Sequence, residues 1–296
     1  MNICVTLKLL LLLFACLLEQ TVWAEDEPNC GYLNEVSYAN PTHVADLSEF
    51  PWIGRVGYQT DHGIEYKCLA VLISKQHLLA PAECFVEKKL IETQVKWVLL
   101  GDWNPRNPYL EPDCDSQQRC NPETQLMEIE EIIIQPNYNN PSFASNIALL
   151  KLVQSVNFSS HIRSICLRAN KSISYFGQYF HFGGFAVNAS IPHKLKGTTQ
   201  IQKPLRTRAT LYGYNYISEA ISVSLSALCG DSNQTTPLLR GSPLMAVNVV
   251  GGKPQSYVLV GLLQIMKNEK NSLVFIKVQP HIEWIKNSIQ SMTDTD

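Results

Sequence analysis

Short apolar or alternating runs, separated by turn-forming glycine, proline, asparagine and aspartate, dominate the chain from Phe50 onward. Alternation over roughly four to eight residues is typical of half-buried strands, and many such runs at short spacing indicate a sandwich or a barrel. We therefore predict an all-β protein. The predicted strands lie within residues 53–58, 68–73, 95–100, 127–134, 147–153, 257–265 and 273–278.

One segment near the C-terminus has helical spacing instead. Ile282, Ile285 and Ile289 recur at intervals of three and four within residues 281–291, just after Pro280. This spacing places the three side chains on one face of a helix. We predict a single C-terminal α-helix packed on one two-lobed β unit, because the chain shows no internal repeat.

The first 24 residues have the pattern of a cleavable secretory signal. Lys8 precedes an apolar run from residue 9 to residue 18, and Val22-x-Ala24 follows it. A membrane anchor needs roughly 20 apolar residues, and Glu19 and Gln20 interrupt this run. We expect residues 1–24 to be removed, leaving a short N-terminal segment, residues 25–40, ahead of the β unit.

Composition narrows the functional classes. The formal net charge is −2 at pH 7, so neither nucleic acid nor an anionic membrane is an expected partner. We also predict no cofactor and no metal site. The nine cysteines, two of them in the leader, and four Asn-x-Ser/Thr sequons fit a secreted glycoprotein. The candidate glycosylation sites are Asn157, Asn170, Asn188 and Asn233.

Six short segments follow one another in an order that carries more information than any one of them. They are EFPW at 49–52, LLAPAEC at 78–84, GDW at 101–103, NIALLKL at 146–152, ICL at 165–167 and GSPLM at 241–245. In this order they resemble the entry strand, the histidine-bearing turn, the GEW segment, the aspartate-bearing segment, the interdomain cysteine and the nucleophile motif of the trypsin-like serine proteases. The resemblance runs from about Phe50 to Ile285. It implies two packed six-stranded antiparallel β-barrels over residues 41–292, with the active site between them.

The cysteines extend this resemblance. It implies the disulfides Cys68–Cys84, Cys30–Cys166 and Cys114–Cys120, the last around an insertion similar to one in arthropod clip-type proteases and their masquerade-like inactive homologues. Only five residues separate the leader from Cys30, so we expect no clip domain. Cys229 is left over. A buried free thiol is the simpler interpretation, and an intermolecular disulfide is the alternative.

The chemistry of the resembled family needs a hydroxyl nucleophile, an imidazole and a buried carboxylate. The matching positions hold Glu83 for the histidine, Asn146 for the aspartate and Arg240 for the serine. A carboxylate is a poor proton acceptor for serine at pH 7, an amide carries no charge, and a guanidinium is no nucleophile. We predict that the chain is no enzyme, and that Glu83 and Arg240 form an ion pair in the old cleft.

The supporting parts also differ from the family pattern. Leu238 stands at the glycine of the oxyanion hole, and Leu239 replaces the acidic residue that pairs with the N-terminus released by activation. The expected cleavage junction, residues 38–41, has no basic residue before it and no IVGG. In the strand that lines the specificity pocket of the resembled family, this chain has Gln264, Ile265 and Met266. Leu273 replaces a glycine of the pocket wall, and Thr236 a cysteine that braces the pocket, so we expect the pocket to be filled.

Three functions remain open at this point. The first is a secreted, catalytically inactive serine protease homologue that binds an extracellular protein partner, possibly a protease or zymogen, as regulator, cofactor or decoy in an immune or melanisation-like cascade. The second is a hydrolase with a relocated nucleophile, Ser232 of Gly230-Asp231-Ser232, although Asn-Gln-Thr follows it. The third is a small-molecule binder that uses the old cleft. His77 is interpreted as a strand histidine rather than a displaced base.

Overall fold

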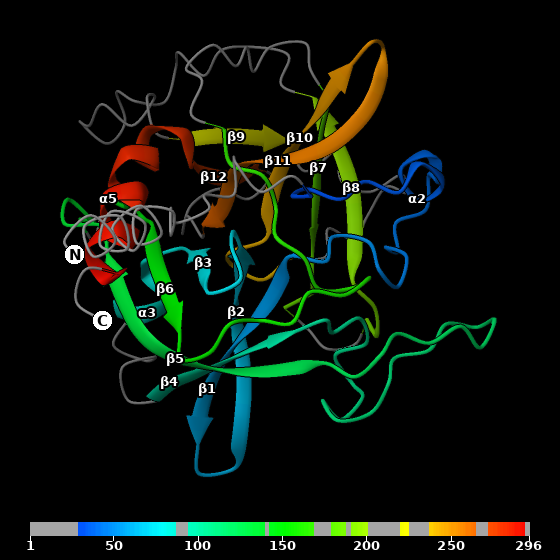
Figure 1. Ribbon diagram of the computed structural model, residues 1–296, viewed down its shortest axis with the longest axis horizontal. Coiled ribbons are helices and arrows are strands. Elements are labelled where there is room, and N and C mark those ends of the chain that lie inside the picture. Colours follow the sequence, from blue (N-terminus) through cyan, green and yellow to red (C-terminus); the bar gives the residue numbers. More distant parts are fainter. Residues whose placement is uncertain are drawn as a thin grey trace, which may run out of the picture.

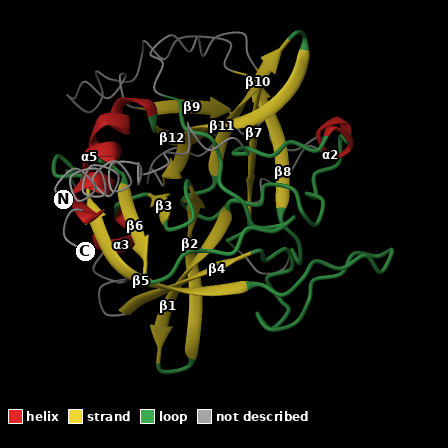
Figure 2. Cartoon of the chain, in the orientation of Figure 1, coloured by secondary structure: helices red, strands yellow, loops and turns green. Residues whose placement is uncertain are grey.

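The computed structural model describes residues 29–86, 94–139, 142–168, 179–187, 191–200, 220–224, 237–264 and 272–293. Most of its regular secondary structure consists of strands, and the helices are short (Figures 1 and 2). The signal-like leader lies outside the described residues. Among the described residues, no helix is both long enough and apolar enough to cross a membrane.

The first lobe is a closed antiparallel barrel of six strands in the order β1-β2-β3-β6-β5-β4. The pairing β1–β4 completes the ring, with Gly54 opposite Leu100. The strands are β1 (Ile53–Thr60), β2 (Gly63–Leu72), β3 (His77–Ala80), β4 (Gln94–Leu100), β5 (Gln125–Ile134) and β6 (Ala148–Leu152). Short helix α3 (Glu83–Val86) follows β3 directly.

The second lobe is a six-stranded antiparallel sheet in the order β8-β7-β10-β11-β12-β9. Within the described residues no ladder joins its end strands, β8 and β9. The strands are β7 (Tyr179–Gly184), β8 (Leu195–Gln200), β9 (Ala220–Ser224), β10 (Pro243–Val250), β11 (Lys253–Gln264) and β12 (Ser272–Lys277). The hairpin of β10 and β11 extends away from the sheet, as Figure 1 shows in orange.

The C-terminal helix, red in Figure 1, packs on the main hydrophobic core. A 3₁₀ turn, η3 (Gln279–His281), leads into α5 (Ile282–Thr293). Its buried residues Ile282, Ile285, Ile289 and Met292 recur every three or four positions and belong to the main core. That core combines the barrel interior with one face of the second lobe, so a single hydrophobic cluster joins both lobes.

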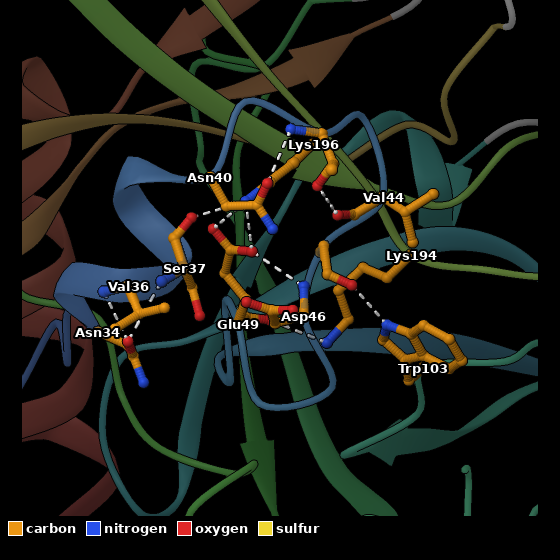
Figure 3. A network of polar contacts seen from close by, with 12 residues as sticks. Asn34, Val36, Ser37, Asn40, Val44, Asp46, Glu49, Trp103, Lys194 and Lys196 are labelled. Atoms are coloured by element: carbon orange, nitrogen blue, oxygen red, sulfur yellow. Dashed lines mark hydrogen bonds and ion pairs between the residues drawn. The ribbon is translucent and has the colours of Figure 1, made fainter. Parts of the chain in front are cut away.

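The N-terminal segment is fixed to the second lobe. Asn34 caps α2 (Glu35–Ala39) by accepting from the backbone N–H groups of Val36 and Ser37. Figure 3 shows the polar network beneath this helix, where the Lys196 ammonium donates to the Ser37 carbonyl at 2.8 Å and to the Glu49 carboxylate at 2.9 Å. The expected cleavage junction therefore lies at the end of a docked helix.

Further along, the same segment covers the outer edge of β8. The backbone N–H of Lys196 donates to the His43 carbonyl, and that of Ala45 donates to the Lys194 carbonyl. Residues 43–45 thus run beside β8 like an added strand, and an isolated antiparallel bridge joins Val44 to Leu195. Because an unpaired sheet edge invites pairing with other chains, this cover protects the second lobe.

The predicted fold, an all-β chain of two packed six-stranded antiparallel barrels with a C-terminal helix, is confirmed, with the first barrel closed and the second forming a half-barrel among the described residues. Each strand predicted from the pattern is present within a few residues. Strands β7 to β10 were not predicted, because their sequences contain glycines, a leading proline and polar residues. Lys196 on β8 is one of these polar residues. Its side chain is buried, and the salt bridge with Glu49 compensates its charge there.

Three disulfides are present: Cys30–Cys166, Cys68–Cys84 and Cys114–Cys120. They are the pairs that the family resemblance implies. The first ties the N-terminal segment to the connection between the lobes. The second links β2 to the first turn of α3, and the third closes the loop between β4 and β5.

Candidate functional site

Glu83 lies fully buried at the junction of β3 and α3. Pro81 breaks the strand after Ala80, and the Cys68–Cys84 disulfide fixes the start of the helix. The Glu83 side chain has no exposed surface. Its backbone N–H donates to Oδ1 of Asn146 at 2.9 Å. The position expected for a histidine thus presents a carboxylate at the contact between the lobes.

Asn146 occupies the position just before β6 and is also fully buried. Its Nδ2 donates to Glu83 Oε1 and to Gln264 Oε1, both at 3.1 Å. Gln264 is the last residue of β11 in the second lobe. One amide therefore accepts a backbone N–H of the first lobe and donates to side chains of both lobes.

Arg240 reaches the same point from the second lobe. Its Nη1 lies 3.6 Å from Glu83 Oε2, and its side chain is 20% exposed. The predicted ion pair of Glu83 and Arg240 is confirmed. A guanidinium and a carboxylate at this separation attract each other strongly when one of them is removed from water.

The backbone around Arg240 has little freedom. Gly241 has a φ of +87°, and a Cβ on it would come within 1.9 Å of the Leu69 carbonyl oxygen, so only glycine fits. The Leu69 N–H donates to the Arg240 carbonyl at 2.7 Å. The second lobe is thereby attached to β2 directly beside the ion pair.

Leu238 and Leu239 turn into the protein. They are 7% and 8% exposed, and the Leu239 N–H donates to the Phe185 carbonyl at 2.8 Å. The Ser242 hydroxyl also donates to Leu239, at its carbonyl. Both leucines therefore pack into the hydrophobic core.

His77 begins β3 and is buried, as expected of a strand histidine. It lies opposite Lys151 of β6, and its Nδ1 is 3.0 Å from the Ser74 hydroxyl. Burial, with a smaller contribution from the Lys151 charge, lowers the pKa of His77 to about 4. The imidazole is therefore neutral at pH 7 and held by strand contacts.

Several sequence-based predictions fall outside the described residues: the state of Cys229, the rival nucleophile Ser232, the pocket position Thr236, and the sequons at Asn170, Asn188 and Asn233. Leu273 is described and packs partly buried against the second-lobe core. Asn157 is exposed in the described part of the chain.

The sequence did not reveal that Gln264 completes this site. Its strand was expected only to line a specificity pocket. The signal available was the chemistry of Asn146, an amide with two donor hydrogens that needs acceptors when buried. Glu83 supplies one acceptor and Gln264 the other. The three degenerate positions and Gln264 therefore form one polar cluster that joins the two lobes.

The polar cluster lies at the contact between the two lobes, where the family resemblance implies a protease active site. A family model described as Trypsin matches residues 40–285. The chain belongs to the trypsin family. Family membership accounts for the barrel, the second sheet and the terminal helix, but not for the identity of the residues in the cleft.

Among trypsin-family relatives, the CLIP domain-containing serine protease B9 of Anopheles gambiae is 25% identical over 83% of this chain. The chain spans 62% of the length of that relative. Phenoloxidase-activating factor 3 of Holotrichia diomphalia is 26% identical, over 90% of this chain and 76% of its own length. Both relatives are insect proteins.

The solved structures agree on the fold. The Drosophila Grass clip serine protease of the Toll pathway superposes with a TM-score of 0.71, at 20% identity, over 90% of this chain and 77% of the other. A structure described as GrC gives 0.60 at 19% identity, over 84% and 98%. At these identities the likeness concerns the fold alone.

Proposed function

We propose that this protein is a catalytically inactive member of the trypsin family that acts by binding an extracellular protein. One observation carries the proposal: Arg240 and Glu83, which the family resemblance aligns with the nucleophile and the base, are paired with each other. Neither can perform the role of the residue it replaces, since a guanidinium offers no nucleophilic oxygen and the carboxylate is fully buried.

The surroundings support the same conclusion. Asn146 supplies no negative charge to stabilise an imidazolium, and Leu238 and Leu239 pack into the core. The junction near residue 39 follows a docked helix and lacks a basic residue, so proteolytic activation has no expected target. We take residues 41–292 as the trypsin-like domain, preceded by a signal peptide over residues 1–24 and by a short N-terminal segment.

The leader pattern, the disulfides and the similar proteins support secretion and a protein partner. The leader pattern, the three disulfides and the sequons fit an oxidising, extracellular compartment. The names of similar proteins include a phenoloxidase-activating factor and a protease of the Toll pathway. We infer that this chain is a regulator, cofactor or decoy for a protease or zymogen of such a cascade, with exposed loops on the rigid barrel as the contact surface.

The experiment is active-site labelling of the purified protein with a fluorophosphonate probe, beside an active trypsin-like protease. We expect no labelling. Stoichiometric labelling would overturn the proposal in favour of a hydrolase with a relocated nucleophile. A Ser232→Ala variant then identifies the site, because labelling at Ser232 disappears in that variant and labelling elsewhere persists.

A further inference from the structure

A hollow of about 510 Å³ lies on the outside of the first barrel, away from the degenerate catalytic positions. One side is formed by β1 and β2, including Arg55 and Tyr66, and the other by the loop that follows β4, including Pro108 and Tyr109. Binding pockets for ligands typically have about 300–1,000 Å³. The hollow is therefore large enough for a few residues of a peptide.

The loop side of the hollow is rigid. Asp113 is 2% exposed and accepts from the backbone N–H groups of Trp103 and Asn104, at 2.6 and 2.9 Å, and from the Asn107 amide at 2.9 Å. The Thr124 hydroxyl donates to the Tyr109 carbonyl. The Cys114–Cys120 disulfide closes the loop beyond these bonds. Little conformational entropy remains to be lost there on binding.

Two hydrogen-bond donors on the barrel side have no acceptor among the described residues. They are Nε of Arg55 and the hydroxyl of Tyr66. The Arg55 guanidinium lies 4.0 Å from the Tyr66 ring centroid, and its Nη1 is paired with Asp102. A buried donor without a partner costs roughly 1–3 kcal/mol, and native structures rarely contain two side by side. Their position on the wall of one hollow points to an acceptor that enters it.

The charges around the hollow already balance. Arg55 is paired with Asp102, and Lys67 with Glu65 at 2.8 Å. A carboxylate entering the hollow would add an uncompensated charge, whereas a neutral carbonyl oxygen satisfies the donors without that cost. The remaining wall residues are two prolines, Ile64, Leu99, two tyrosine rings and Asn107, whose amide already donates to Asp113. Flat rings and prolines suit the face of an extended, proline-containing chain.

We propose that this hollow binds an uncharged, proline-containing extended segment of a partner protein, whose backbone carbonyls accept from Tyr66 and Arg55. The inference rests on the protein-binding function proposed above and identifies the surface that serves it. Both donors are covered in the unbound structure, so the segment must displace a rim side chain. Lys67 and Tyr109 are partly exposed and can turn about their own side-chain bonds without backbone movement.

Exposed apolar side chains extend the surface beyond the hollow. Tyr109 is 39% exposed and Leu110 is 68% exposed, and the backbone N–H of Glu111 closes a turn onto Pro108 beneath them. Apolar residues held at the tip of a rigid loop gain contact area at low entropic cost when a partner covers them. They would contact the partner residues that flank the proline-containing segment.

The test is fluorescence anisotropy with a labelled hexaproline amide as the probe. We expect saturable binding, weakened about 5-fold by Tyr66→Phe, as the loss of one neutral hydrogen bond implies. The matched control is Tyr179→Phe, because Tyr179 is 68% exposed on β7 of the other lobe, and this variant should bind like the wild type. An equally labelled peptide of alternating glutamate and proline should bind several-fold more weakly than hexaproline.

A structural role for Tyr66 is separated from a binding role by thermal unfolding. Because its hydroxyl has no internal partner, Tyr66→Phe should unfold at the wild-type temperature or slightly above it. Strong destabilisation, absence of probe binding, unchanged binding by Tyr66→Phe or preference for the glutamate peptide would each overturn the docking proposal. None of these results bears on the fluorophosphonate test, so the inactive, protein-binding function can stand when this surface assignment fails.

Discussion

Asn146 of the first lobe and Gln264 of the second are joined by a hydrogen bond of 3.1 Å between Nδ2 and Oε1. Both side chains are almost completely buried. The family resemblance aligns Asn146 with an aspartate that orients a histidine in active members. Here the amide is required instead, because a carboxylate would place an acceptor against the two acceptors that Asn146 now serves, Glu83 Oε1 and Gln264 Oε1.

Restoring the family residue should therefore destabilise this protein. We expect Asn146→Asp to lower the free energy of unfolding by about 2–4 kcal/mol, since two hydrogen bonds are lost and two carboxylates face each other without water. Urea unfolding with the disulfides intact measures it. Asn248→Asp is the control, because the Asn248 Oδ1 accepts from Arg168 at 2.6 Å and a carboxylate keeps that bond. Equal stability of Asn146→Asp and the wild type would contradict this account.

The Glu83–Arg240 ion pair should contribute to stability as a buried pair does, because Glu83 is fully buried and Arg240 is only partly exposed. Arg240→Met leaves the fully buried Glu83 carboxylate without its cation, and we expect a loss of about 2–4 kcal/mol. Glu83→Gln in the same chain should recover part of the loss by removing the unpaired charge.

Lys67→Met is the matched control for that measurement. Its ion pair with Glu65 is 38% and 49% exposed, and exposed pairs contribute about 0–1 kcal/mol. If denaturant unfolding gave the same small change for Arg240→Met as for Lys67→Met, the cleft pair would have no structural role.

How far the sequence determined the fold differs between the two lobes. First-lobe strands such as β5 and β6 are continuous or alternating apolar runs that the period-two pattern identifies directly. On β8 the pattern fails, because Lys196 is buried through an ion pair that forms only when Glu49 arrives from a distant part of the chain. A local pattern cannot contain that information, since the compensating charge is 147 residues away.

The site shows the same limit. The ordered motifs predicted that Glu83, Asn146 and Arg240 meet in one cleft and that the two opposite charges pair, and the structure brings the three together. Gln264 was placed in the cleft wall, but its bond to Asn146 depends on side-chain directions at the end of β11. The hollow beside Arg55 was not predicted at all, because it arises from the approach of a loop to β2 and not from any motif.

Acidification should destabilise the protein through two histidines, His77, which is buried, and His181, which is half-buried. Burial, followed by the Lys151 charge, lowers the pKa of His77 to about 4, and burial, followed by the Lys196 charge, does the same for His181. An unfolded chain binds these protons near pH 6.5, so between pH 6.5 and 4 it holds more protons than the folded chain. The contribution of the two histidines to the free energy of unfolding is fully present above pH 6.5 and decreases as the pH falls towards 4.

We expect a decrease on the order of 1–3 kcal/mol per histidine across this range. Burial raises the pKa of Glu49, and that group acts in the opposite direction. Denaturant unfolding from pH 7 to 5 tests the expectation. The double variant His77→Gln, His181→Gln should show a flatter pH dependence, and a slope as steep as that of the wild type would assign the effect to other groups.

Asn157 should carry an N-linked glycan. Of the four sequon asparagines, Asn157 is the one that lies within the described residues, and it is exposed there. Its backbone is held by Gln125, whose amide donates to the Asn157 carbonyl at 2.7 Å. Asn157→Gln should reduce the mass of the secreted protein by one glycan. Gln154→Asn, which creates no sequon, should leave the mass essentially unchanged.

Lys196 should control the attachment of the N-terminal segment. Its ammonium bonds both the Ser37 carbonyl and the Glu49 carboxylate, so Lys196→Met releases the end of α2 and leaves a buried carboxylate unpaired. We expect a loss of about 3 kcal/mol and faster proteolysis between residues 34 and 46. The Cys30–Cys166 disulfide retains the cut piece, so the fragment should separate only after reduction. The control is Lys194→Met, which should have a smaller effect. Among the described residues the Lys194 ammonium donates to a backbone carbonyl, that of Glu49 at 3.2 Å, and not to a carboxylate. Burial also lowers the pKa of Lys194 to about 8. Equal protease resistance of Lys196→Met and the wild type would mean that the backbone bonds along β8 hold the segment without the ion pair.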